Sequence, residues 1–135
     1  MPALTSGRYD IQWTQLADLP APLYNTYVAV QHHKIYVTGT SPVEDAVHQV
    51  HVYNINTDQW NQLPPSGHYY GIPHIIGGRL AIIGGYLSAT NKITNKVSTL
   101  DEKSRKWSSY YPDLLSNRCK PGIVGIWSIL LSLVG

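Results

Sequence analysis

The sequence predicts an all-β protein built from successive four-stranded sheets. Three observations carry this prediction. The tryptophans Trp13, Trp60 and Trp107 stand 47 residues apart from one another. Between them lie short runs rich in valine, isoleucine, threonine and tyrosine, separated by turn residues, as is typical of β-strands. No stretch of about 12 residues or more has the periodicity of an amphipathic helix.

The composition is that of a folded, weakly charged protein. The 135 residues are enough for one ordinary domain, and 43% of them are hydrophobic while 13% are charged. The net charge of +2 and the lack of a Lys/Arg cluster predict no nucleic-acid partner and no membrane partner. A single cysteine, Cys119, excludes an intramolecular disulfide, and the first residues lack the apolar core of a signal peptide. We therefore expect a cytoplasmic location.

The C-terminal residues 122–135 are largely apolar. They number 14, fewer than the ~20 that a membrane-spanning helix needs. We expect a pair of buried strands here rather than a membrane anchor.

Other residues recur with a spacing close to that of the tryptophans. They are Leu19, Leu63 and Leu114, and, 20 or 21 residues after each leucine, Gly39, Gly84 and Gly135. Several independent markers thus define a repeat of about 47 residues.

Each repeat has room for four short strands. In the first repeat we expect strands over residues 26–30, 34–38, 49–54 and 59–63. His32 and His33 form the first turn, the loop over residues 41–46 follows the second strand, and a tight turn over residues 56–58 precedes the fourth. One such sheet cannot bury both of its faces, so neighbouring repeats must stack.

The repeat that ends at Trp107 is the most complete. Its strand over residues 80–83 is followed by Gly84 and Gly85, and a second strand over residues 97–100 precedes the tryptophan by seven residues. A glycine pair after a strand, an aromatic residue at the end of the third strand and a tryptophan seven residues later resemble the kelch repeat. The resemblance covers the chain from about Ile11 onward.

The resemblance implies a β-propeller, in which four-stranded blades surround a central channel. Two positions depart from the pattern: Leu100 replaces the usual tyrosine, and Gly39-Thr40 replaces the first glycine pair. We expect two complete blades, over residues 24–63 and 70–109, together with a lone fourth strand over residues 11–16 and two strands of a further blade over residues 123–134. The chain would then be an arc of a propeller, either a fragment of a longer protein or completed by another chain.

In terms of domains, we expect a polar lead-in over residues 1–10 and a partial kelch propeller over residues 11–135. Its repeats would cover approximately residues 17–63 and 64–110, with a truncated third repeat over residues 111–135.

No group of residues predicts catalysis or metal binding. Adjacent histidines such as His32 and His33 point to opposite faces of an extended chain, so they cannot easily chelate, and His48 and His51 on one strand are similarly placed. Cys119 lies between two cationic residues, but no neighbouring histidine or carboxylate completes a nucleophilic site. We predict no catalytic residues, no metal and no cofactor.

Two acidic pairs and a glycine pair are interpreted as turn residues. The acids Glu44, Asp45, Asp101 and Glu102 lie in or beside polar loops, where solvated side chains are the default. Gly77 and Gly78 are expected to form a hairpin turn, because a phosphate-binding loop would need a following helix.

The resemblance places partner binding in the loops. In kelch propellers, the links from fourth to first strand and from second to third strand surround one mouth of the channel. The partner-binding residues predicted here are Tyr24, Asn25, Ser41, His68, Tyr69, Ser88, Arg118 and Lys120. Tyrosine and arginine are common interface anchors. The alternative for the tyrosines is that they pack between blades.

The function that follows is a non-enzymatic module that binds a protein or peptide. Many kelch propellers present substrates to cullin ubiquitin ligases together with a BTB domain, which this chain lacks, so that role is implied only for a longer protein. The alternative is a fragment of a kelch-fold enzyme, an oxidase or a sugar epimerase. We also expect the isolated chain to be marginally stable and to self-associate, because its outer sheets leave apolar faces uncovered.

Overall fold

The computed structural model describes residues 10–42, 48–119, 122–126 and 129–133, the last two segments by their strand pairing alone. Every regular element in these residues is a β-strand and the sheets are antiparallel, which confirms the predicted all-β class. Within the same residues, no helix is long and apolar enough to cross a membrane.

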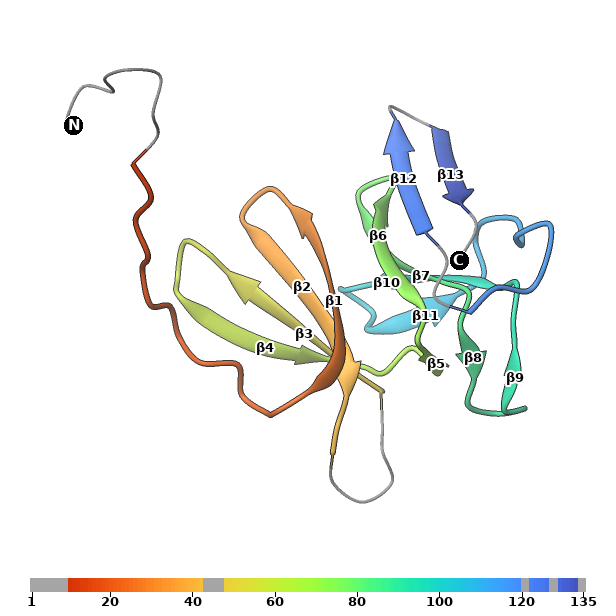
Figure 1. Cartoon of the computed structure of the whole chain (residues 1–135), viewed down its shortest axis with the longest axis horizontal. Coiled ribbons are helices and arrows are strands. Elements are labelled where there is room, and N and C mark those ends of the chain that lie inside the picture. Colours follow the sequence, from red (N-terminus) through yellow and green to blue (C-terminus); the bar gives the residue numbers. More distant parts are fainter. Residues whose placement is uncertain (1–9, 43–47, 120–121, 127–128, 134–135) are drawn as a thin grey trace.

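Two four-stranded sheets form the body of the molecule (Figure 1). The first blade contains β1 (Tyr24–Gln31), β2 (Lys34–Thr40), β3 (His48–Asn54) and β4 (Gln59–Leu63), in that spatial order. The second blade contains β6 (Ile72–Ile76), β7 (Arg79–Ile83), β10 (Val97–Asp101) and β11 (Lys106–Ser108), also in chain order across the sheet. These are the two complete blades that the repeat predicts.

Two smaller sheets complete the arrangement. β12 (Gly122–Ile126) pairs with β13 (Ile129–Leu133), as predicted for the apolar C-terminal stretch. β5 (His68–Tyr69), β8 (Tyr86–Leu87) and β9 (Lys92–Ile93) form a three-stranded sheet that the sequence interpretation missed. We call it the accessory sheet; Figure 1 shows it extending below the second blade.

The turns have the local chemistry that the sequence predicts. Gly77 and Gly78 both have positive φ, 57° and 79°, the backbone pattern favoured in two-residue hairpins. His32 turns the equivalent hairpin of the first blade at φ 51°. Asn54 and Asp101 each accept hydrogen bonds through their side chains from backbone N–H groups two and three residues later, which holds the turn after the third strand of each blade.

The main core lies between the two blades. The first blade contributes five residues and the second blade two. They are Ala29, Tyr36, Val50, Val52 and Leu63, with Leu80 and Leu100 opposite. A second core of Ala81, Ile83 and Val97 covers the far face of the second blade, where Tyr111 and Leu114 pack against it. The sheets therefore stack face to face, as repeats that cannot bury both faces alone must do.

The predicted lone strand over residues 11–16 is wrong, because residues 10–19 form no strand. Ile11 is 78% exposed and Trp13 is 93% exposed. A strand needs a neighbour to accept its backbone hydrogen bonds, and this segment pairs with no strand in the described part of the chain. Ala17 attaches it to the first blade instead, donating its N–H to Asp58 Oδ1 at 3.0 Å and accepting the indole N–H of Trp60 at 2.8 Å.

Candidate functional site

A groove of about 480 Å³ lies where the first blade meets the accessory sheet. Its lining contains four tyrosines, and we call it the tyrosine groove. The lining residues are Tyr24, Thr40, Tyr69, Tyr70, Tyr86, Ser88 and Asn91. They come from the start of β1, the end of β2, the end of β5 with the link that follows it, and the β8–β9 hairpin. The groove is therefore on the side of the blades where the strand links were expected to bind a partner.

The accessory sheet forms one wall and is held tightly against its neighbours. Tyr69 pairs with Tyr86, and Gly85 immediately before β8 has φ 86°. A Cβ atom on Gly85 would overlap the Tyr69 carbonyl oxygen and lie 2.5 Å from the Gly71 nitrogen. The glycine pair of the repeat thus allows two backbone segments to approach closely, and this approach positions the tyrosines.

The four tyrosines form an aromatic surface with defined geometry. The rings of Tyr70 and Tyr86 meet edge to face, with centroids 6.1 Å apart and planes at 77°. Tyr69 contacts the buried His48 ring in a similar arrangement at 6.2 Å. Tyr24 is 45% exposed, and the other three are half-buried. Aromatic pairs with this geometry stabilise the structure beyond the contribution of the area they bury, and they hold the rings in place.

His68 and His48 lie behind the groove. His68 Nδ1 donates to the Gly84 carbonyl at 2.8 Å, which leaves Nε2 to accept from the Ser98 hydroxyl at 2.8 Å in the neutral ring. Burial lowers the His68 pKa. His48 has no hydrogen-bond partner at either ring nitrogen within the described chain. Burial, and to a lesser extent the neighbouring His68, lowers the His48 pKa to about 4. Both rings are therefore neutral near pH 7.

The structure brings together three of the predicted partner-binding residues. Tyr24, Tyr69 and Ser88 all line the tyrosine groove. Asn25 is exposed next to Tyr24. That a partner contacts these four residues stays a prediction.

The remaining four predicted residues lie elsewhere. Ser41 is 4% exposed and His68 is 1% exposed, so neither side chain is accessible in the described chain, and that a partner contacts them stays a prediction. Arg118 is half-buried and holds the accessory region through its backbone, since its carbonyl accepts the Gly85 N–H at 2.7 Å and its N–H donates to Thr94. Lys120 lies outside the described residues.

Four groove residues were not chosen from the sequence. They are Thr40, Tyr70, Tyr86 and Asn91. Tyr70 and Asn91 belong to loops that the propeller resemblance already pointed to, and Tyr86 directly follows the glycine pair. What the sequence did not indicate is that two-residue strands bring these loops together.

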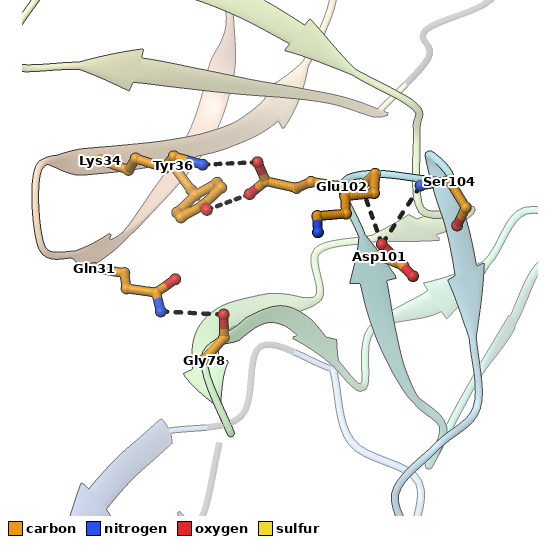
Figure 2. A network of polar contacts seen from close by, with 8 residues as sticks. Gln31, Lys34, Tyr36, Gly78, Asp101, Glu102 and Ser104 are labelled. Atoms are coloured by element: carbon orange, nitrogen blue, oxygen red, sulfur yellow. Dashed lines mark hydrogen bonds and ion pairs between the residues drawn. The ribbon is translucent and has the colours of Figure 1, made fainter.

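A charged depression of about 630 Å³ lies at the opposite ends of the strands. Here Lys34 Nζ is 2.9 Å from Glu102 Oε2, the buried Tyr36 hydroxyl donates to Glu102, and Gln31 donates to the Gly78 carbonyl at 3.1 Å. Figure 2 shows these contacts reaching from the first blade to the turns of the second. We call them the interblade clasp. Glu102 is therefore not the solvated turn residue that the sequence suggested.

The described residues contain no group of three or more His, Cys, Asp or Glu side chains arranged to hold a metal ion. Cys119, the lone cysteine, is half-buried.

Comparisons with known proteins agree with the fold. No protein-family model matches the chain. It is 34% identical to Kelch-like protein 21 of Mus musculus over 68 residues, which are 49% of this chain and 11% of that protein. It is 30% identical to Kelch-like protein terF of Aspergillus terreus over 138 residues, which are 91% of this chain and 29% of that protein.

The solved structure titled "Structure of YjhT" superposes with a TM-score of 0.69 at 17% identity, over 85% of this chain and 46% of that one. At this identity the similarity concerns the fold alone. The chain thus spans less than a third of the length of the two curated relatives and about half of the solved structure. Its repeats are similar to those of these Kelch-like proteins, and its fold is an arc of a kelch-type β-propeller.

Proposed function

We propose that this chain is a non-enzymatic interaction module that binds a segment of a protein or peptide in the tyrosine groove. The observation that carries the proposal is the convergence of four tyrosines, from separate segments of the chain, on one accessible groove. Tyrosine supplies a large contact area at low conformational cost, and its hydroxyl group can still bond a partner.

The surroundings of the groove support this role. Its walls are strand links and a small sheet, carried by two blades whose relative position is fixed by a shared core and by the interblade clasp. Binding residues placed on loops over a rigid scaffold are common in proteins, because the scaffold orders the loops before the partner arrives.

The similarity to Kelch-like protein 21 and to Kelch-like protein terF extends the proposal to a longer protein. In a chain that also carries a BTB domain, the groove would hold the substrate that a cullin ubiquitin ligase modifies, in the cytoplasm. The groove does not favour the oxidase or epimerase alternative, since its lining contains no His, Cys, Asp or Glu.

Peptide selection tests the proposed function. A random peptide library is selected on the wild-type chain, on Tyr24→Ala and on Tyr110→Ala. Tyr24 lines the groove, whereas Tyr110 is 74% exposed and is not among the lining residues, which makes it a matched control. We expect peptides enriched on the wild type to be lost on Tyr24→Ala and kept on Tyr110→Ala. Equal enrichment on all three proteins would contradict the proposal.

A further inference from the structure

We infer that the occupant of the tyrosine groove is a proline-rich segment in the polyproline II conformation. This inference rests on the proposed function and names the partner class for the same site. It is drawn from the charge of the groove, the edges of the accessory sheet and the backbone of Tyr70.

The groove offers aromatic rings and neutral hydrogen-bonding groups. Besides the four tyrosines it is lined by Thr40, Ser88 and Asn91, and none of the seven side chains is charged at neutral pH. An acidic or basic peptide therefore finds no opposite charge in it. A polyproline II segment has the matching chemistry, because its pyrrolidine rings pack on aromatic faces while its carbonyls, free of internal hydrogen bonds, accept from hydroxyl and amide donors.

Addition of a peptide strand to a sheet edge is the other common way to bind an extended segment. The accessory sheet forms one wall of the groove, and its outer strands β5 and β9 have two residues each, while the edge strand β1 of the first blade contributes only its first residue, Tyr24. Such short edges offer almost no row of unpaired backbone groups for a new strand. Recognition in the groove must then come from side chains, as it does for polyproline II ligands.

The backbone of Tyr70 places a bulky side chain in an uncommon conformation at the groove. Tyr70 has φ 57°, in the left-handed region, where a bulky residue is an outlier. The equivalent position of the first repeat holds Asn25 at φ 52°, and asparagine tolerates this conformation well. Strain of this kind gathers at ligand sites, where the side chain compensates for it. The Tyr70 ring meets Tyr86 at 77° and makes an aromatic corner in the groove.

The experiment compares two libraries of short peptides that are identical except for a fixed core, Pro-X-X-Pro in one and Ala-X-X-Ala in the other. Both are selected on the wild-type chain, on Tyr70→Asn and on Tyr110→Asn. Tyr70→Asn places at this position the residue that the first repeat already uses, so we expect its melting temperature to stay close to that of the wild type. Should it unfold, Tyr24→Ala at the exposed rim replaces it.

We expect the proline library to be enriched about tenfold over the alanine library. This enrichment should disappear on Tyr70→Asn and persist on Tyr110→Asn. Equal enrichment of both libraries, still lost on Tyr70→Asn, would overturn the proline-rich partner and leave the proposed function intact. Enrichment that no groove variant reduces, or no enrichment at all, would overturn both.

Discussion

Trp60 and Trp107 make the same hydrogen bond in successive repeats. Each donates its indole N–H at 2.8 Å to a backbone carbonyl, Trp60 to Ala17 and Trp107 to Pro64. Both the donors and the acceptors are 47 residues apart, so the sequence repeat is also a repeat of individual bonds. In each case the tryptophan ties the last strand of a blade to the link that leads into its first strand.

Replacing Trp107 tests this bond. Trp107→Phe keeps an aromatic ring but leaves the Pro64 carbonyl without its donor, and we expect a loss of about 1–3 kcal/mol in the free energy of unfolding. Trp13→Phe is the matched control, since Trp13 is 93% exposed and should change stability by less than ~0.5 kcal/mol. Urea unfolding followed by circular dichroism measures both. Equal losses would show that the indole bond contributes nothing specific.

Gly85 is expected to tolerate no side chain. Gly85→Ala combines a left-handed backbone with overlap onto the Tyr69 carbonyl, and we expect it to cost more than ~2 kcal/mol and to displace the accessory sheet. Gly78→Ala separates the cost of the left-handed backbone from the cost of steric overlap. Gly78 also has a positive φ, 79°, but the atom nearest to an added Cβ would lie 3.5 Å away. Thermal unfolding of the two variants gives the comparison. If both lose the same stability, close approach at Gly85 plays no part.

The regular parts of the fold were predictable because their signals are local. Strand composition, the turn at His32 and the glycines Gly77 and Gly78 are determined by a few neighbouring residues, and the structure confirms them. The strand predicted over residues 11–16 failed because a strand depends on a partner, which no local pattern supplies. Likewise, strands of two residues have no periodicity to detect, so the accessory sheet could not be foreseen.

The candidate site was predictable only as a set of loops. The repeat indicates which links share one side of the blades, and Tyr24, Tyr69 and Ser88 do line one groove. Which loop side chains are accessible is decided by tertiary packing. His68 is an example. It was expected in an accessible link, but it is buried between the Gly84 carbonyl and the Ser98 hydroxyl group, and the neighbouring sequence does not indicate this burial.

Stability should fall in mild acid because of His48. Its pKa is about 4 in the folded chain, below the ordinary 6.5, since burial and His68 both disfavour the charged ring. The unfolded chain therefore binds the proton first, and the stabilisation is complete above pH 6.5 and lost as the pH falls toward 4. The lowered pKa corresponds to a contribution on the order of 3 kcal/mol to the free energy of unfolding at neutral pH. Urea unfolding at a series of pH values measures it.

A His48 variant tests this source. His48→Gln should make the curve of stability against pH less steep, and the slope that remains should come from His51, His68 and His74, whose pKa values burial also lowers. An identical slope in the wild type and in His48→Gln would rule out His48 as the source.

The interblade clasp should contribute more than an ordinary surface ion pair. Glu102→Gln removes the charge that Lys34 and the buried Tyr36 hydroxyl both contact, and we expect a loss of about 1–2 kcal/mol. Asp113→Asn breaks the more exposed pair with Lys96, which should cost less than ~1 kcal/mol. Denaturant midpoints of the two variants test this order. The reverse order would show that the clasp does not hold the blades.

The 135-residue chain is expected to self-associate. Val28 and Val30 on β1 are 57% and 60% exposed, and they lie on the face of the first blade that turns away from the second. Changing both to threonine keeps the preference for a strand and lowers the apolar area, so sedimentation should shift toward the monomer. A monodisperse wild-type monomer with a sharp transition at high temperature would argue against this expectation.

The accessory sheet shares no strand with either blade, although its residues line the tyrosine groove. Three of the seven groove residues, Tyr86, Ser88 and Asn91, are therefore encoded in a hairpin that contributes no strand to either blade. The β8–β9 hairpin can be exchanged for another of equal length without altering any blade strand, provided that Gly85 is retained. The arc is for this reason a candidate framework for grafting new binding loops.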